Sequence, residues 1–500
     1  MDSKVNPYVL AAPCLAISAA LFFLGTGLTP FWLCTWLAAI PVLWLAPRVS
    51  SWHAFFVGVA AYALGGLNEW GYSRQVLPTW LVASLLLLGA CVFGLAVLLF
   101  RGRIRRGRVW QAAVIVPAFW VVADYLLSVV SIHGTFGNIG YSQMNFLPIV
   151  QIASVTGIWG IAFCMFLFSG TVAAVLSAGR LSRKISVAIG AGICLVCVLA
   201  FGFWRLAATP RNSQTVKVAL VASSAEGNFF AGTPERLHGV LERYAEAMKG
   251  LAGQGIQLVV LPEHIGPITD ASESDADALL GQMAKDTGAY VAIGIERIES
   301  KLSRNQERLY SPDGKLAAIY NKHHMLPPFE SVYTPGTTRT VLDEPSGKWG
   351  IEICKDMDFP RLSRGYSQDG IGMLIVSASD FVQDGWLHGR MAVLRGVEGG
   401  FSIARSANLG ILTATDDRGR ILAEQDTLKG PPFTTAIATI PVRHDTTIYS
   451  RFGDWFAWMC MVLFTLALLS SFRPQSEDTE RAFEEGNPVR ASSPEKEVPV

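Results

Sequence analysis

Three residues of chemically reactive types, Glu263, Lys322 and Cys354, each follow a short apolar segment of the chain. A cysteine is a strong nucleophile as its thiolate, and a neighbouring carboxylate such as Glu263 can accept the thiol proton. Lys322 and the backbone N–H that follows Cys354 can stabilise the oxyanion formed when the thiolate attacks a carbonyl carbon. These residue types predict acyl chemistry through a covalent intermediate on Cys354.

Cys354 has no disulfide partner in its own region of the chain. It is the only cysteine between about residues 208 and 453, and the other seven lie in long apolar runs: Cys14, Cys34, Cys91, Cys164, Cys194, Cys197 and Cys460. An unpaired thiol at the end of a predicted strand, amid charged residues, is placed as a nucleophile would be. The alternative is a structural cysteine that packs as a small hydrophobic side chain.

The segments around these residues alternate between strand and helix patterns, which predicts an α/β layered fold. The predicted strands cover 216–222, 257–261, 290–296, 309–310, 316–320, 349–353, 373–377, 401–406 and 410–415, and the predicted helices cover 234–250, 274–287, 361–366 and 385–398. Glu263, Lys322 and Cys354 each fall at or just beyond a strand end. Such ends can converge at one edge of a sheet, where α/β folds build their sites.

The rest of the chain is far more apolar. Of the 500 residues, 51% are hydrophobic and only 16% are charged, and the mean hydropathy of +0.35 is too high for an ordinary soluble protein. A membrane-spanning helix needs about 20 apolar residues. Such runs predict seven spans before the α/β region and one after it, near residues 8–27, 30–47, 52–69, 79–100, 110–131, 147–178, 185–206 and 454–472.

The chain is therefore divided into a seven-helix membrane domain at 1–207, an α/β catalytic domain at 208–453, a last membrane helix at 454–472 and a tail at 473–500. The tail is rich in Glu, Ser and Pro and is expected to be disordered.

Basic loops predict the orientation. Arg48, the five arginines within 101–108, and the cluster Arg180, Arg183 and Lys184 are expected to stay in the cytoplasm. Both termini are then cytoplasmic, and the α/β domain lies on the extracytoplasmic side of the membrane. The net charge of +1 gives no argument for a nucleic-acid partner.

At this point the sequence resembles the nitrilase, or carbon–nitrogen hydrolase, superfamily. The segments that carry the resemblance are Leu261-Pro262-Glu263, Asn321-Lys322-His323-His324 with Glu330 eight residues after the lysine, and Ile353-Cys354-Lys355-Asp356. Because membrane spans stand on both sides of the α/β region, the chain is similar to the apolipoprotein N-acyltransferase family within that superfamily. Segments 117–126, 140–143, 390–408 and 449–455 add to the similarity.

The resemblance implies an α-β-β-α sandwich beside a multi-span helical membrane domain. It implies a phospholipid acyl donor, expected to be phosphatidylethanolamine, a thioester intermediate, and an acceptor amine on a diacylated apolipoprotein. A monomer in a bacterial inner membrane is expected, with a periplasmic catalytic domain, no cofactor, no metal and no nucleic acid. The implied site is a triad with supporting residues: Glu263, Lys322 and Cys354, with Glu330, Asp356 and Lys355.

Two departures from the family pattern bear on substrate preference. The family's cysteine is usually followed by an aromatic and then an acidic residue, whereas Lys355 and Asp356 stand here. A cation beside Cys354 is expected to lower the pKa of the thiol. The segment before the first predicted helix lacks the family's tryptophan and offers Phe229 and Phe230, which are candidate substrate-binding residues in an apolar lid.

Two other functions fit the same residues. One is a membrane-tethered amidase, in which water resolves the acyl-enzyme, and the other is a non-catalytic paralogue that only binds lipid or lipoprotein. Asp124 lies inside a predicted span. An acidic residue there has either a functional role or a structural role, in which it forms a hydrogen bond between helices. His323 and His324 are expected to point to opposite sides of an extended segment, so they predict no zinc site.

Overall fold

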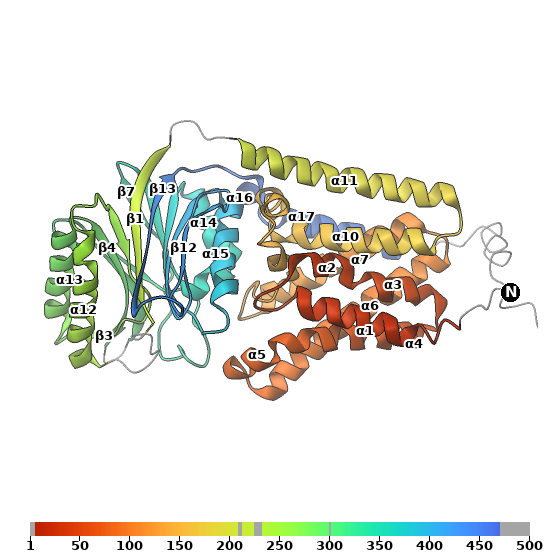
Figure 1. The fold of residues 1–500 in the computed structure, drawn as a ribbon, viewed down its shortest axis with the longest axis horizontal. Helices are drawn as coiled ribbons and strands as arrows, with labels where there is room; N and C mark the ends of the chain where they lie inside the picture. Colours follow the sequence, from red (N-terminus) through yellow and green to blue (C-terminus); the bar gives the residue numbers. More distant parts are fainter. Residues whose placement is uncertain (1–5, 209–212, 225–232, 300–301, 471–500) are drawn as a thin grey trace, which may run out of the picture. The chain divides into compact units, whose positions relative to one another are not determined.

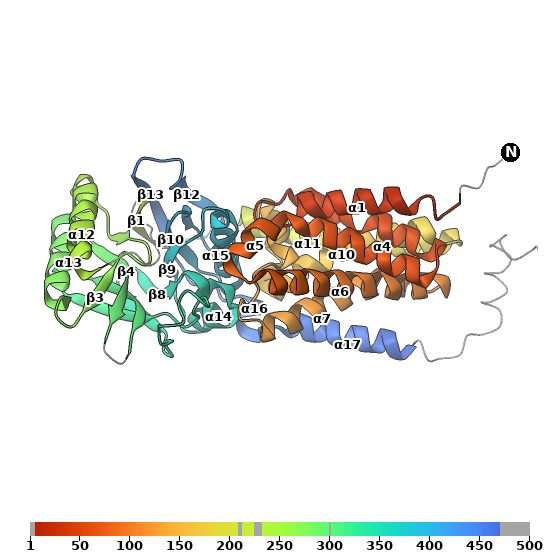
Figure 2. The same ribbon diagram turned by 90° about the horizontal axis from the view of Figure 1, so that it is seen from below.

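The computed structural model describes residues 6–208, 213–224, 233–299 and 302–470. Within it the chain forms two compact units, each assembled from separate segments. The helical unit contains residues 1–126, 162–198 and 456–500, and the α/β unit contains residues 127–161 and 199–455. Figures 1 and 2 show the helices of the first and the layered sheets of the second. Phe229, Phe230 and the predicted tail lie outside the described residues.

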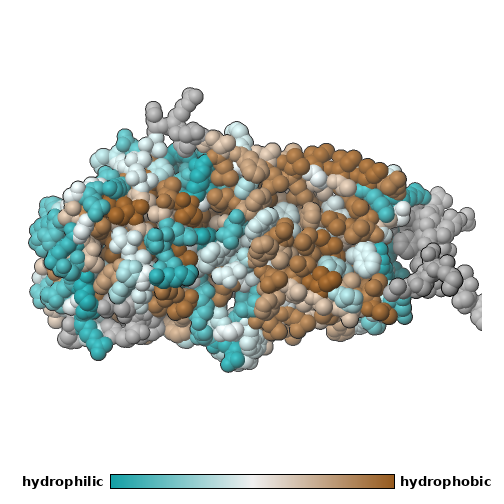
Figure 3. Space-filling model, in the orientation of Figure 1, coloured by the Kyte–Doolittle hydropathy of each residue, from teal (hydrophilic) through white to brown (hydrophobic). Residues whose placement is uncertain are grey.

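Apolar helices dominate the helical unit, and hydrophobic side chains cover them on the face shown in Figure 3. Among the described residues, four helices are long and apolar enough to cross a membrane: α6 (Thr79–Arg105), α7 (Val109–Val130), α10 (Ile158–Ser177) and α11 (Leu181–Ala207). The shorter ones include α1 (Ala11–Gly25), α2 (Trp32–Ala38), α3 (Ile40–Leu45), α4 (Ser51–Gly65) and α17 (Trp455–Leu469).

The structure differs from the single span predicted over 147–178. The segment is divided into α8 (Leu147–Val150), α9 (Ala153–Thr156) and α10. Gly157 has a φ of +67°, a left-handed conformation that ends a helix and favours glycine. The backbone N–H of Ile158, at the start of α10, then donates to the Glu398 carboxylate at 2.8 Å. Hydropathy alone could not reveal this break, because every piece is apolar.

Arginines of the predicted cytoplasmic loop cap the last turn of a helix. Arg103 donates to the carbonyl of Ala467 at 2.8 Å, and Arg108 donates to that of Ser470 at 2.6 Å. The last carbonyls of a helix have no partner within it, so guanidinium groups satisfy them and complement the helix dipole. The basic residues that predict orientation therefore also hold α17.

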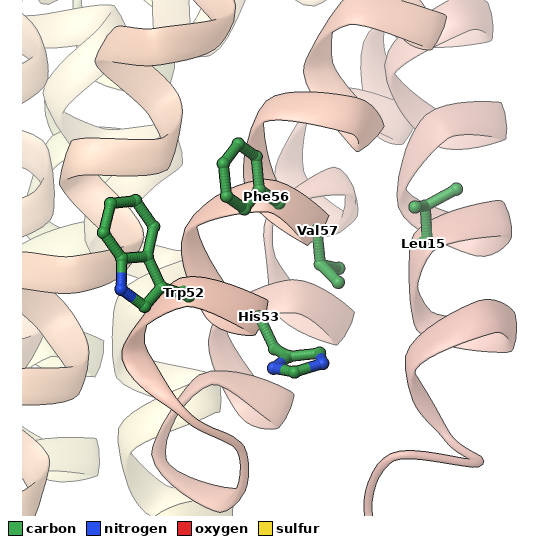
Figure 4. Close-up of a pocket in the computed structure, with 5 residues that line it drawn as sticks. All are labelled: Leu15, Trp52, His53, Phe56 and Val57. Carbon is green, nitrogen blue, oxygen red and sulfur yellow. The ribbon is translucent and has the colours of Figure 1, made fainter.

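A surface pocket of the helical unit lies between α1 and α4 (Figure 4). It is lined by Leu15, Trp52, His53, Phe56 and Val57. Trp52 and Phe56 are exposed. None of the candidate catalytic residues belongs to this pocket.

The α/β unit contains two sheets. The first has the order β13-β1-β2-β4-β5-β6, with β3 beside β4. The second has the order β12-β11-β10-β9-β8-β7. The first comprises β1 (Gln214–Ser223), β2 (Leu258–Val260), β3 (Pro267–Thr269), β4 (Tyr290–Ile298), β5 (Arg304–Tyr310), β6 (Leu316–Asn321) and β13 (Phe433–Val442). The second comprises β7 (Thr340–Glu344), β8 (Gly347–Ile353), β9 (Met373–Ser379), β10 (Ser402–Asn408), β11 (Ile411–Thr415) and β12 (Ile421–Asp426).

Alternating side chains divide the α/β unit into layers. Along β1, Val218 and Leu220 face the second sheet, while Ala219 and Val221 face α12 (Pro234–Met248) and α13 (Glu273–Thr287). On the other side, α14 (Pro360–Gln368) and α15 (Gly385–Gly399) cover the second sheet, as Figure 1 shows. This is the expected α-β-β-α sandwich. Every strand and helix predicted for the region is present.

The segment between α7 and α10 belongs to the α/β unit. It includes a 3-10 helix, η3 (Ile139–Gln143), and it packs on α15. Arg395 of α15 donates to the Tyr141 hydroxyl at 2.8 Å and pairs with Glu398 at 2.9 Å. The segments at 140–143 and 390–408, which share the family resemblance, therefore meet in space.

Candidate active site

The three predicted catalytic residues follow strands whose ends meet at one edge of the sandwich. β2 and β4 are parallel, and β5 is antiparallel to both β4 and β6, so β6 runs in the same direction as β2. Glu263 comes shortly after β2, and Lys322 directly follows β6. In the second sheet Cys354 directly follows β8, which is parallel to β9. Glu263, Lys322 and Cys354 therefore lie at or just beyond strand ends, as the sequence predicts.

Glu263 is fully buried, and three groups donate hydrogen bonds to its carboxylate. Oε1 accepts from Lys322 Nζ at 2.8 Å and from Asn305 Nδ2 at 2.7 Å, and Oε2 accepts from the Ser379 N–H at 3.1 Å. His264 Nε2 lies 3.5 Å from Oε1. These contacts fix the carboxylate and compensate its charge, because an unpaired buried carboxylate would cost several kcal/mol.

Lys322 is shared between two carboxylates. Its Nζ lies 2.8 Å from Glu263 Oε1 and 2.8–2.9 Å from both oxygens of Glu330. Burial lowers the pKa of Lys322, but Glu263 and Glu330 outweigh it and hold that pKa well above its usual range. The lysine is therefore a fixed cation. Burial likewise raises the pKa of Glu330, but Lys322 and His264 hold it well below its usual range.

Cys354 begins a short 3-10 helix, η5 (Cys354–Asp358), with a φ of +43°. A positive φ is unusual for a residue with a side chain, and such strain is concentrated at functional sites. The thiol lies 3.7 Å from the Ser379 carbonyl oxygen. Burial and then the Glu263 charge raise the pKa of Cys354 well above its usual value, against the opposing effect of Lys322. The resting residue is a thiol, so it needs a base.

Asp356 connects the lysine loop to the cysteine helix. Its carboxylate accepts from the Tyr320 hydroxyl at 2.7 Å and from the His324 N–H at 2.8 Å, and also from the backbone N–H of Ile353 at 3.3 Å. The residues flanking Lys322 and Cys354 are thereby held to one buried anion. The supporting role of Asp356 stays a prediction, which these contacts favour.

The Lys355 side chain is bound by groups other than the Cys354 thiol. The charged groups that act most on Cys354 are Glu263, Lys322, Asp380 and Arg405. The ammonium of Lys355 is buried, where it contacts His133 Nδ1 at 3.0 Å and donates to Asp358 at 3.3 Å. The pKa of Cys354 is raised overall, and the expectation that Lys355 acts to lower it stays a prediction.

Several buried residues of the site are absent from the set predicted from the sequence. Asn305, at the start of β5, donates to both Glu263 and Glu330 at 2.7 Å. Glu307, on the same strand, is a carboxyl whose pKa is raised to about 8 by burial. His264 contacts three carboxylates. Its place directly after Glu263 was the only hint in the sequence, since its partners come from distant segments.

Two groups of side chains offer metal-binding atom types within 4.8 Å of one another: Glu263, His264 and Glu330, and Asp380, Asp384 and His388. Each group already contacts a protein cation. Lys322 pairs with the first, and Arg405 pairs with Asp380 at 2.5 Å in the second. The charge balance of each group is therefore supplied by side chains of the chain itself.

Two family models match separate parts of the chain. Residues 217–444 match the carbon–nitrogen hydrolase family model, and residues 18–171 match that of the apolipoprotein N-acyltransferase N-terminal domain. An apolipoprotein N-acyltransferase from Geobacter metallireducens is 27% identical over an alignment covering 93% of this chain and 96% of the relative. One from Haemophilus ducreyi is 25% identical, covering 90% and 95%.

Two solved structures each match about half of the chain. An amidase from a Nesterenkonia species is 18% identical with a TM-score of 0.42, covering 50% of this chain and 97% of the amidase. A nitrilase-superfamily member from Saccharomyces cerevisiae is 24% identical with a TM-score of 0.38, covering 47% and 93%.

Proposed function

Because the chain belongs to the apolipoprotein N-acyltransferase family, we propose that it moves a fatty acyl chain from a membrane phospholipid to the N-terminal amine of a diacylated apolipoprotein. The observation that carries the proposal is the meeting of Cys354, Glu263 and Lys322 at one edge of the two-sheet sandwich, in a chain with apolar helices before and after the catalytic unit. Both substrates are anchored in the membrane, so an enzyme held at the bilayer gains proximity to each.

In the first half-reaction Glu263 accepts the Cys354 proton, and the thiolate attacks the ester carbonyl of the phospholipid. Lys322 and the backbone N–H that follows Cys354 stabilise the oxyanion of the tetrahedral intermediate. As the intermediate collapses, the C–O bond breaks and Glu263 returns its proton to the departing oxygen. A lysophospholipid leaves, and a thioester remains on Cys354.

In the second half-reaction the neutral amine of the diacylglyceryl-cysteine attacks the thioester carbonyl. Glu263 accepts a proton from the attacking nitrogen. The C–S bond breaks, an amide forms, and Cys354 regains its proton from Glu263. The same carboxylate therefore serves as base, then acid, in each half, which fits its position between Lys322 and the Ser379 N–H.

Glu330 and Asp356 support this cycle through their contacts with the triad and its flanking backbone. Glu330 holds Lys322, and Asp356 holds the backbone next to Cys354. The proposal further takes phosphatidylethanolamine as the donor, a monomer as the active form, and an extracytoplasmic catalytic unit. The last point is supported by the arginine-rich loops of the helical unit.

A stalled half-reaction tests the proposal. Purified protein given labelled phosphatidylethanolamine alone should release about one equivalent of lysophospholipid and then stop, with the acyl group on Cys354. Adding a diacylglyceryl-cysteine peptide should restart turnover and acylate its amine. Mass spectrometry of the stalled protein identifies the adduct. Steady release of fatty acid without acceptor would instead establish a hydrolase, and no release at all would support a binding paralogue.

A further inference from the structure

His264 lies at the centre of the buried charges, directly after the proposed base. Its φ is +59°, and it is buried. Nδ1 lies 2.7 Å from Glu296 Oε1, and Nε2 lies 3.2 Å from Glu330 Oε1. Both nitrogen atoms of one ring therefore face carboxylate oxygens.

This geometry determines the protonation state of the ring. An ionised carboxylate only accepts hydrogen bonds, and a neutral imidazole carries a proton on just one nitrogen. Two acceptors at opposite ring nitrogens require a proton on each. Burial alone would lower the pKa of His264, but Glu263 and the hydrogen-bonded Glu296 and Glu330 raise it to about 10. The ring is therefore an imidazolium throughout the physiological range.

The groups that face this ring come from every element around it. They are Glu263 after β2, Glu296 on β4, Asn305 on β5, and Glu330 and Tyr333 in the loop after β6. Lys322, directly after β6, pairs with Glu263 and Glu330. Among the described residues of this cluster, three carboxylates are opposed by Lys322 and His264. Without the imidazolium, Glu263 and Glu330 would share one ammonium, and like charges so close favour protonation of one of them.

We propose that His264 is a positioning residue for the base: as a fixed cation it keeps both Glu263 and Glu330 ionised around Lys322, so that Glu263 can accept the Cys354 proton. This inference rests on the proposed function, in which Glu263 is that base. His264 transfers no proton itself, because a ring held by three carboxylates does not release one at neutral pH.

The protonation state can be measured in the unmodified protein. Carbon-13 NMR of protein labelled at histidine Cε1 should show the His264 signal at the imidazolium position, unchanged from pH 6 to pH 8.5. The chain has eight histidines, so the signal is assigned by its absence in His264→Asn. If that variant does not fold, substitution of the other seven assigns it by elimination. A His264 signal that titrates near pH 6.5 overturns the inference.

The pH profile of thioester formation tests the positioning role. His264→Asn removes the charge, and asparagine tolerates a positive φ. The acid limb of the burst rate should move to higher pH by about 1 unit or more. His264→Lys keeps a cation and should keep the limb near its original pH even if the rate falls. His238→Asn is the matched control, because His238 is solvent-exposed on α12 and forms a surface ion pair with Glu242.

The outcomes separate the two proposals. If the wild-type protein gives no lysophospholipid burst, the proposed function fails whatever the NMR shows. If the wild type gives a burst while His264→Asn lowers its rate at every pH without moving the acid limb, the role of His264 is only structural and this inference fails alone.

Discussion

Ser379 lies between the candidate base and the candidate nucleophile. Its N–H donates to Glu263, and its carbonyl faces the Cys354 thiol. The two side chains come from different sheets, so the end of β9 aligns them. At the scale of single residues, the site is built from buried charges that each have a defined partner, which is how a low-dielectric pocket can hold so many ionised groups.

Cys354→Ser should abolish thioester formation and leave the fold unchanged. A serine hydroxyl is a much weaker nucleophile than a thiolate beside this base, so the burst should fall by about 10⁴-fold or more. Release of labelled lysophospholipid measures the effect, and the apparent Tm in detergent checks the fold. Wild-type turnover in this variant would remove Cys354 from the mechanism.

Glu307→Gln should change stability in a pH-dependent way. The pKa of about 8 in the folded protein lies above the usual carboxyl pKa of 4.5. The wild-type carboxyl therefore contributes most to stability below pH 4.5, and this contribution falls by about 1.4 kcal/mol per pH unit until pH 8. Glutamine does not titrate, so the variant should gain apparent Tm relative to wild type between pH 5 and pH 8. An equal Tm difference at both pH values would contradict the assignment.

At the scale of elements, the loop between α7 and η3 supports the helix that carries the nucleophile. The Thr135 N–H and hydroxyl both donate to the carbonyl of Asp358 at 2.9 Å, at the end of η5. Lys355 joins the same segment through His133. The residue that departs from the family pattern therefore serves this contact, which explains how a lysine is tolerated next to Cys354.

Gly134→Ala should lower the rate of acyl transfer. Gly134 has a φ of +51°, and an added Cβ would lie 2.4 Å from the Asp358 carbonyl oxygen, so the loop or η5 must move. A displacement of this size near the nucleophile should cost roughly tenfold or more. Gly137→Ala is the matched control, because Gly137 has a φ of +79° in the same loop but open space around it. Equal rates for the two variants would exclude the steric explanation.

Elements with a clear hydrophobic periodicity can be predicted from the sequence. Elements and site residues whose place depends on contacts between distant segments cannot. The strands before Glu263, Lys322 and Cys354 were visible as apolar segments bounded by polar residues. β13 was not predicted, because it is defined by pairing with β1 from the far end of the unit. His264 was missed for a similar reason: Glu296 and Glu330 are 32 and 66 residues away, so only the fold brings them together.

At the scale of the whole molecule, the arginine loops lead us to expect the catalytic unit outside the cytoplasm. A membrane-impermeant maleimide applied to intact spheroplasts should label Lys315→Cys, at a hairpin turn where the lysine side chain is 81% exposed. Arg106→Cys, at an exposed position of the arginine loop, should be labelled only after permeabilisation. Labelling above the wild-type background is the readout, and the reverse pattern would invert the orientation.

The divided α/β unit has a consequence for how the protein is made. Residues 127–161 leave the ribosome well before α15, which they cover. At typical synthesis rates the interval is roughly 10 to 50 seconds. During that time the segment around Tyr141 cannot pack on α15, and the unit cannot complete its folding until α10, α11 and the remaining strands and helices of the unit have been synthesised. A fragment limited to residues 208–453 would lack this early segment, so we expect it to be a poor substitute for the catalytic unit in isolation.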